Sequence, residues 1–106
     1  MKKILVDDIR DWLPEGGTPD IIIRNFETAY DMLDYIENPN CELYLDHDLG
    51  YGGKTGYDLI TIIEKDHHEK SSSFGSLPAK IVCVSDNPPG RARIQQVIDN
   101  LYNRTA

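Results

Sequence analysis

Four short, almost uninterrupted apolar runs constrain the fold of this chain more than any other feature. They cover residues 3–6, 21–24, 43–45 and 80–84 and are rich in Ile, Val and Leu. The runs do not alternate cleanly with polar residues, as strands with one solvent-exposed face do. Continuous apolar runs of this length are typical of strands that are buried on both faces. We therefore expect a parallel sheet of about four strands.

Helical patterns lie between and after the apolar runs. Apolar residues recur at helical spacing in three segments, residues 26–36, 59–63 and 94–101. Each segment has one apolar face, as expected of a helix that packs on a sheet. The sequence Asn-Pro-Asn at residues 38–40 ends the first helix, while Thr55 and Asn87 are placed to cap the second and the third.

The order of these elements predicts an α/β fold with a doubly wound parallel sheet, of the flavodoxin or receiver type. We expect a truncated version of it, with no fifth strand and a reduced first helix. The connection over residues 8–20 has only a weak helical pattern, so a loop or a single turn is expected there. The second strand ends in Arg24 and Asn25 and is expected at the sheet margin. Residues 1–106 are expected to form a single domain.

Composition narrows the class of partner. The net charge is −7, and an acidic surface repels phosphates, so we expect no general nucleic-acid binding. The segment from Pro88 to Arg104 has three arginines and one aspartate, so a small anion can still bind near it. No apolar run is long enough for a membrane span or a signal-peptide core, which predicts a cytoplasmic protein without membrane contact. Cys41 and Cys83 show no zinc-ligand spacing and are expected to stay reduced.

Acidic and small polar residues follow three of the four predicted strands. They are Asp7 and Asp8 after the first strand, Asp46, His47 and Asp48 after the third, and Ser85, Asp86 and Asn87 after the fourth. The C-terminal ends of parallel strands meet at one edge of a sheet, where ligands bind in open α/β folds. Clustered carboxylates repel one another unless a cation lies among them. We therefore expect a pocket of Asp7, Asp8, Asp46 and Asp48 that holds Mg²⁺ or Mn²⁺.

The metal ligands that we predict are Asp7, Asp8 and Asp46, and the catalytic candidates are Asp46, His47 and Asp48. Each also has a purely structural interpretation. Aspartates at strand ends often cap turns. His47 is explained equally well by hydrogen bonds to its acidic neighbours and by an acid–base role.

The candidates for phosphate binding lie near the start of the last predicted helix and after the acidic pair. Ser85 and Asn87 suit either ligand contact or helix capping. Arg91 lies near a helix N-terminus, where anions bind readily, and Arg10 is a second candidate clamp. The alternative for Arg91 and Arg93 is pairing with the acidic surface.

The assembled motifs resemble those of response-regulator receiver domains, with Asp46 at the position of the phosphoacceptor and Ser85 at that of the switch Ser/Thr. A closer resemblance, over nearly the whole chain, is to cyclic-phosphate-processing receiver domains. It rests on Asp-Asp-x-Arg at residues 7–10, Leu-Asp-His-Asp-Leu-Gly at 45–50, Thr-Gly-Tyr-Asp at 55–58 and Ser-x-Asn-Pro-x-Gly-Arg at 85–91. Members of that family often have a histidine where this chain has Val84.

The resemblance implies metal-dependent handling of a phosphate or cyclic phosphate ester, so the expected partner is a small phosphorylated ligand. The first hypothesis is a phosphoesterase that hydrolyses this ligand. The alternative is a non-catalytic module of receiver type, either a phosphoacceptor in signalling or a nucleotide-binding domain. A third is a protein-interaction domain with a vestigial pocket.

Overall fold

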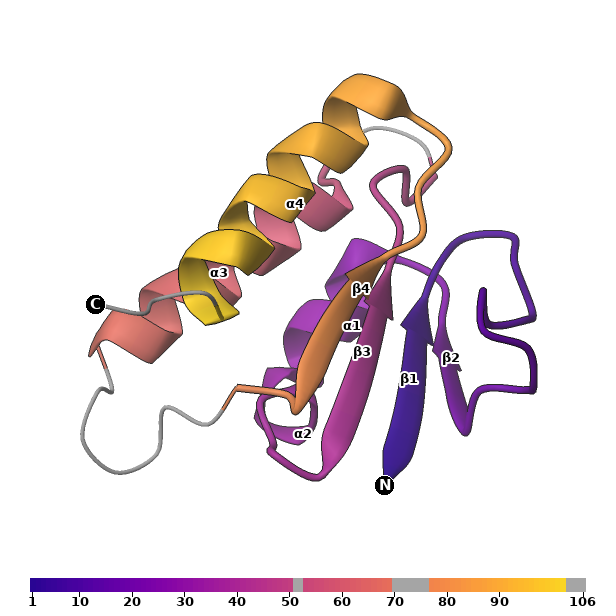
Figure 1. Cartoon of the computed structure of the whole chain (residues 1–106), viewed down its shortest axis with the longest axis horizontal. Coiled ribbons are helices and arrows are strands. Elements are labelled where there is room, and N and C mark those ends of the chain that lie inside the picture. Colours follow the sequence, from indigo (N-terminus) through magenta and orange to yellow (C-terminus); the bar gives the residue numbers. More distant parts are fainter. Residues whose placement is uncertain (51–52, 70–76, 103–106) are drawn as a thin grey trace.

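One parallel sheet of four strands organises the molecule (Figure 1). The structure is a computed structural model, and it describes residues 1–50, 53–69 and 77–102. The strands are β1 (Lys2–Val6), β2 (Ile21–Ile23), β3 (Cys41–Leu45) and β4 (Lys80–Cys83), in the order β2-β1-β3-β4. All three strand pairings are parallel, and β2 lies at the margin. The predicted α/β fold with its receiver-like strand order is therefore confirmed.

Four helices are present among the described residues, namely α1 (Phe26–Asp31), α2 (Leu33–Ile36), α3 (Gly56–Glu69) and α4 (Pro88–Tyr102). Two short helices replace the single helix predicted over residues 26–36, because the chain turns at Met32. The Met32 N–H is shared between the carbonyls of Thr28 and Ala29, each at 3.1 Å, as is common where a helix ends. The turn leaves Ile36 fully buried, so the apolar pattern is still satisfied. None of the described helices combines the length and apolar character that crossing a membrane requires.

Side chains cap the two longer helices where the sequence predicted. The Thr55 hydroxyl accepts a hydrogen bond from the Asp58 N–H at 3.4 Å, and the Asp58 carboxylate accepts one from the Thr55 N–H at 2.7 Å. This reciprocal pair is the arrangement of a capping box. At the start of α4, Asn87 Oδ1 accepts a hydrogen bond from the Gly90 N–H at 3.1 Å. Both caps fix how the chain leaves the edge of the sheet.

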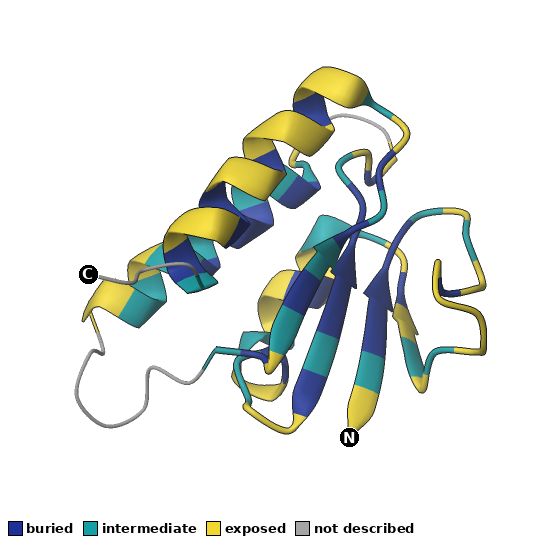
Figure 2. Ribbon diagram, in the orientation of Figure 1, coloured by how far each residue is buried: buried dark blue, intermediate teal, exposed yellow. Residues whose placement is uncertain are grey.

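All four helices pack on the same face of the sheet. Their buried residues form one cluster with those strand residues that point to that face, including Ile4, Leu43 and Leu45. The opposite face has a smaller cluster of Leu5, Tyr44 and Leu13. Leu13 comes from the loop between β1 and β2, which contains no helix, as predicted. Figure 2 shows buried positions along the strands and on the sides of α3 and α4 that face the sheet.

Candidate metal centre

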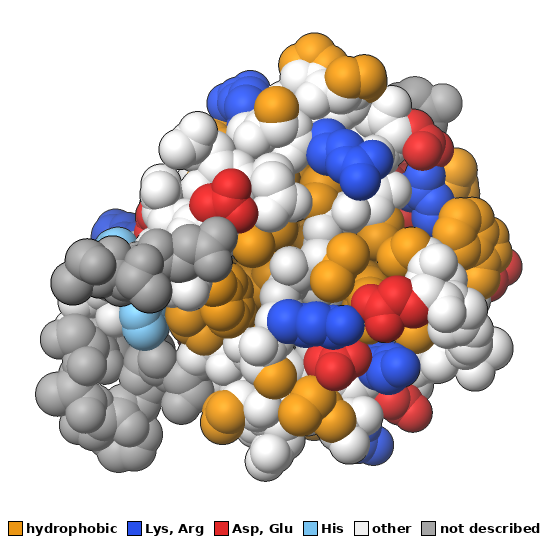
Figure 3. Space-filling view, in the orientation of Figure 1, with side chains coloured by type: hydrophobic (Ala, Val, Ile, Leu, Met, Phe, Trp, Pro, Cys, Tyr) orange, Lys and Arg blue, Asp and Glu red, His pale blue; other side chains and the backbone are white. Residues whose placement is uncertain are grey.

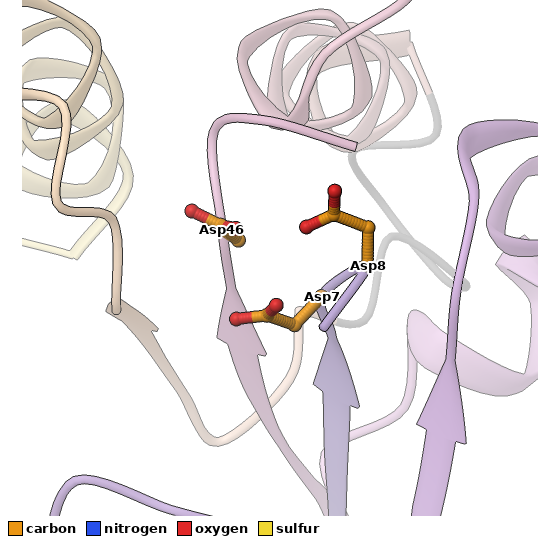
Figure 4. A group of neighbouring side chains, drawn as sticks. All are labelled: Asp7, Asp8 and Asp46. Carbon is orange, nitrogen blue, oxygen red and sulfur yellow. The ribbon is translucent and has the colours of Figure 1, made fainter. Parts of the chain in front are cut away.

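Three aspartates meet where β1 and β3 end. Asp7 and Asp8 follow β1, Asp46 follows β3, and the two strands are hydrogen-bonded neighbours. One carboxylate oxygen from each aspartate lies within 4.8 Å of those from the other two. Figure 4 shows the three side chains beside one another above the ends of these strands. The sequence prediction that these residues converge at the C-terminal edge of the sheet agrees with this geometry.

Asp7 is fully buried and uses both carboxylate oxygens. One oxygen accepts hydrogen bonds from the backbone N–H groups of Ile9 and Arg10, each at 2.9 Å. The other accepts a hydrogen bond from the Arg10 guanidinium, also at 2.9 Å. Asp7 therefore closes the first turn of the β1–β2 loop, so it has the structural role that we weighed against metal binding as well as its place in the group.

The surroundings of Asp46 disfavour its charged form. It is 5% exposed, and one of its oxygens accepts a hydrogen bond from the His47 N–H at 2.8 Å. Burial and then the negative charge of Asp7 raise the pKa of Asp46 to about 6, although Arg10 and the His47 N–H oppose the shift. A divalent cation beside a carboxylate favours its charged form, so a metal here would remove this unfavourable contribution.

Arg10 reaches into the acidic group. One guanidinium nitrogen lies 2.9 Å from Asp7 and 3.7 Å from Asp46, while another contacts Asp86. The hydrogen bond with Asp7 raises the pKa of Arg10 further. We predicted Arg10 as a phosphate clamp, and in this structure it lies among carboxylates. The pairing with Asp86 was not foreseen, and the only sequence signal for it is that Asp86 follows β4 at the same edge.

His47 pairs with Asp48, and neither residue belongs to the group of three aspartates. His47 Nδ1 lies 3.1 Å from a carboxylate oxygen of Asp48. The chain bends at His47, whose carbonyl accepts a hydrogen bond from the Gly56 N–H at 2.8 Å. This bend redirects Asp48, which is largely exposed and lies outside the group of three that we expected it to join. The catalytic roles of both residues remain predictions.

Ser85 and Asn87 act as caps at the start of α4. The Ser85 hydroxyl is buried and accepts a hydrogen bond from the Asn87 N–H at 3.0 Å. Asn87 caps the helix through Gly90, and Arg91 lies in the first turn. Burial raises the pKa of the Cys83 thiol, and the charge of Arg91 is close enough to oppose that shift. Phosphate contact by these residues remains a prediction.

Arg93 is engaged elsewhere. Its guanidinium carbon lies 4.1 Å above the ring centroid of Tyr57 on α3. This is a cation–π contact between α3 and α4. This contact was not predicted, and pairing of Arg93 with the acidic surface stays a prediction.

The family model described as "Cyclic-phosphate processing Receiver domain" matches residues 2–100. The chain belongs to this family. No curated protein and no solved structure matches the chain. In this receiver domain the group of Asp7, Asp8 and Asp46 resembles the metal site of receivers, as the motifs in the sequence implied.

The donor chemistry of the group fits a hard divalent cation. The three aspartates offer only carboxylate oxygens, the ligand type that Mg²⁺ and Mn²⁺ prefer. Mg²⁺ is usually held by one or two carboxylates and keeps several waters, which leaves room for a phosphate oxygen. Both oxygens of Asp7 already accept hydrogen bonds, so Asp8 and Asp46 have more free lone pairs for a cation, while Asp7 adds negative charge and its remaining lone pairs to the group.

Proposed function

We propose that this receiver domain binds Mg²⁺ or Mn²⁺ at Asp7, Asp8 and Asp46 and hydrolyses a cyclic phosphate ester there. The observation that carries the proposal is the group of three carboxylates, reached by Arg10, in a chain of the cyclic-phosphate processing receiver family. Hydrolysis forms one P–O bond from water and breaks one P–O bond of the ring. The product is a phosphate monoester with a free hydroxyl. A metal bound here would polarise the phosphoryl group and acidify water.

In this proposal Arg10 exchanges carboxylates for phosphate. Its guanidinium is held by Asp7, Asp46 and Asp86. A divalent cation would neutralise the first two carboxylates and weaken their attraction for the arginine. The planar guanidinium would then donate paired hydrogen bonds to phosphoryl oxygens and offset the charge that develops on them. Asp86 is almost fully exposed, so breaking its ion pair with Arg10 costs little free energy.

Ser85 and Arg91 supply further donors to the phosphate. The Ser85 oxygen accepts its hydrogen bond from Asn87, which leaves the hydroxyl proton available for a phosphoryl oxygen. Arg91 adds charge at the helix N-terminus, where backbone N–H groups also favour anions. Asn87 contributes by positioning this turn.

Proton transfer is assigned to His47, with Asp48 as the residue that orients it. When Nδ1–H is donated to Asp48, Nε2 carries the lone pair and acts as a base. Nε2 takes the proton of the attacking water and returns it to the departing alkoxide, so no proton is gained or lost overall.

The test is hydrolysis of a panel of cyclic phosphates by purified protein with Mg²⁺ or Mn²⁺. Asp46→Asn keeps the oxygen that accepts from His47 but removes the charge, so we expect metal binding and turnover to be lost together. Asp31→Asn, an exposed aspartate at the end of α1, is the matched control and should behave like the wild type. Equal turnover by Asp46→Asn and the wild type would contradict the mechanism.

The alternative function is that of a non-catalytic receiver, in which Asp46 accepts a phosphoryl group or the site only binds a nucleotide. The position of Asp46 at the end of β3 favours the acceptor version. Mass spectrometry after incubation with a small phosphodonor distinguishes it from the hydrolase. Stable phosphate on Asp46, together with no turnover of cyclic phosphates, would replace the hydrolase proposal with this one.

A further inference from the structure

A large aromatic side chain is exposed to solvent beside the acidic group. Trp12, the only tryptophan of the chain, is 56% exposed in the loop between β1 and β2. The guanidinium carbon of Arg10 lies 5.7 Å from the centroid of its ring. Neither the metal centre nor the phosphate contacts proposed above make use of this ring.

The exposure of Trp12 is not explained by a loosely attached loop. The next residue, Leu13, is 2% exposed and packs on the sheet with Leu5 and Tyr44. Arg24, just after β2, donates a hydrogen bond to the Arg10 carbonyl at 2.9 Å and pairs with Asp11. Trp12 is therefore presented to solvent by neighbours that are fixed on both sides.

Arg10 connects this ring with the proposed phosphate site. The same guanidinium that lies over Trp12 donates to Asp7 at 2.9 Å. Ile9, 75% exposed, adds a second apolar side chain on the same loop. Figure 3 shows hydrophobic side chains over this loop with charged side chains directly next to them. The exposed ring of Trp12 and the phosphate site proposed at Arg10 are therefore separated by no more than the length of one side chain.

We propose that Trp12 stacks on a planar base of the ligand, so that the substrate is a nucleoside cyclic phosphate. The proposal rests on the proposed function, which places the phosphate at Arg10 and the acidic group. Aromatic side chains bind nucleobases of any sequence by stacking, because every base has a flat π face. A protein partner fits this surface less well, since charged Arg10 and Asp11 flank the ring.

The test compares two ligands in the presence of Mg²⁺. One is a nucleoside 2′,3′-cyclic phosphate, and the other is methyl riboside 2′,3′-cyclic phosphate, which has the same sugar and phosphate but no base. We expect the base to improve the dissociation constant by roughly 5- to 150-fold, the range of one stacking contact. Binding of the first ligand should also quench the fluorescence of the protein, because Trp12 is its only tryptophan.

Two variants separate stacking from folding. In Trp12→Ala, calorimetry should show equal affinity for both ligands and unchanged affinity for Mg²⁺ alone. Trp12→Phe should retain part of the preference for the base. Because the side chain is exposed, neither variant should alter the thermal unfolding midpoint appreciably.

Three outcomes decide the matter. Equal affinity of the wild type for both ligands, or a base preference that persists in Trp12→Ala, overturns the stacking proposal and leaves the proposed function intact. Failure of both ligands to bind with Mg²⁺ overturns both. An oligoribonucleotide with a terminal cyclic phosphate distinguishes the two sources of this chemistry. The net charge of −7 predicts that it binds less tightly than the mononucleotide.

Discussion

The titration of Asp46 couples the acidic group to the stability of the fold. Burial and the charge of Asp7 raise its pKa to about 6, whereas the unfolded chain has an ordinary carboxyl value of about 3.9. The native state therefore holds this proton more tightly, so the free energy of unfolding without metal falls as pH rises through about 6. Between about pH 5 and about pH 7.5 we expect Asp46 to contribute a loss of about 1 kcal/mol.

Urea denaturation at the two pH values measures this loss, and Asp46→Asn is the control because it lacks the titrating group. The difference between wild type and Asp46→Asn removes the contributions of the histidines, which titrate in the same range. Mg²⁺ should tighten its binding as pH rises through about 6, since proton and metal compete for the carboxylate. If the free energy of unfolding changed equally with pH in the wild type and in Asp46→Asn, the raised pKa of Asp46 would be refuted.

Arg10 acts as an internal counter-ion to the group when no metal is bound. We expect Arg10→Gln to lower the free energy of unfolding without metal by about 1–3 kcal/mol, because it leaves the buried Asp7 with fewer hydrogen bonds. Removing the competing cation should at the same time strengthen Mg²⁺ binding. Calorimetric titration of the variant beside Arg93→Gln, whose guanidinium contacts only Tyr57 among the interactions described above, tests both statements.

At the residue scale, the sequence was sufficient for the carboxylates but not for their partners. Asp7, Asp8 and Asp46 were predicted because strand ends of a parallel sheet meet at one edge. The pairing of Arg10 with Asp86 joins residues far apart in the chain, and no local pattern encodes it. The departure of Asp48 from the group depends on a bend at His47, which neither spacing nor propensity indicates.

At the element scale, the start of α4 is pressed against the loop after β3. A Cβ atom added at Gly90 would lie 2.5 Å from two carbons of the His47 ring. We expect Gly90→Ala to destabilise the protein by about 1–3 kcal/mol, because the ring has to move. Unfolding measurements should show that His47→Ala in the same chain recovers most of this loss, since the added methyl then fills the space left by the ring. Strictly additive effects would contradict the contact.

The same substitution at Gly56, the first residue of α3, gives a loss of stability with which that of Gly90→Ala can be compared. Its added Cβ would lie 1.9 Å from the backbone carbonyl oxygen of Asp46, which unlike a side chain has no rotamer to change. Gly56→Ala should therefore cost more than Gly90→Ala. Both glycines let a helix begin directly against the loop that carries Asp46 and His47.

Element prediction succeeded where caps and apolar spacing agreed. The helices α3 and α4 begin after Thr55 and Asn87, as the capping residues indicated. The segment over residues 26–36 was predicted as one helix because spacing alone does not report a turn. The break at Met32 preserves the burial of Ile36, so the pattern of apolar residues is the same for both arrangements.

At the scale of the whole molecule, helices cover one face of the sheet and a loop covers part of the other. Leu13 is the buried apolar residue that this loop contributes. We expect Leu13→Ala to lower the free energy of unfolding by about 2–4 kcal/mol and to speed amide exchange in the loop. Ile9→Ala, in the same loop but exposed, should change stability by less than about 0.5 kcal/mol. Similar losses for the two variants would mean that the loop is not anchored through Leu13.

This one-sided arrangement was only partly predictable. The weak helical pattern of residues 8–20 correctly predicted a loop in place of the first helix. It did not reveal how the exposed face would be covered, because the packing of Leu13 and the hydrogen bond from Tyr44 to Glu15 join distant parts of the chain.

Leu13 and Arg24 together hold residues 9–12 in place, since Leu13 packs on the sheet and Arg24 binds the Arg10 carbonyl and Asp11. The exposed side chains of Ile9 and Trp12 lie within this held segment and make no contribution to the helical layer. These two positions can therefore be varied to redesign the surface next to the acidic group while the core keeps its packing.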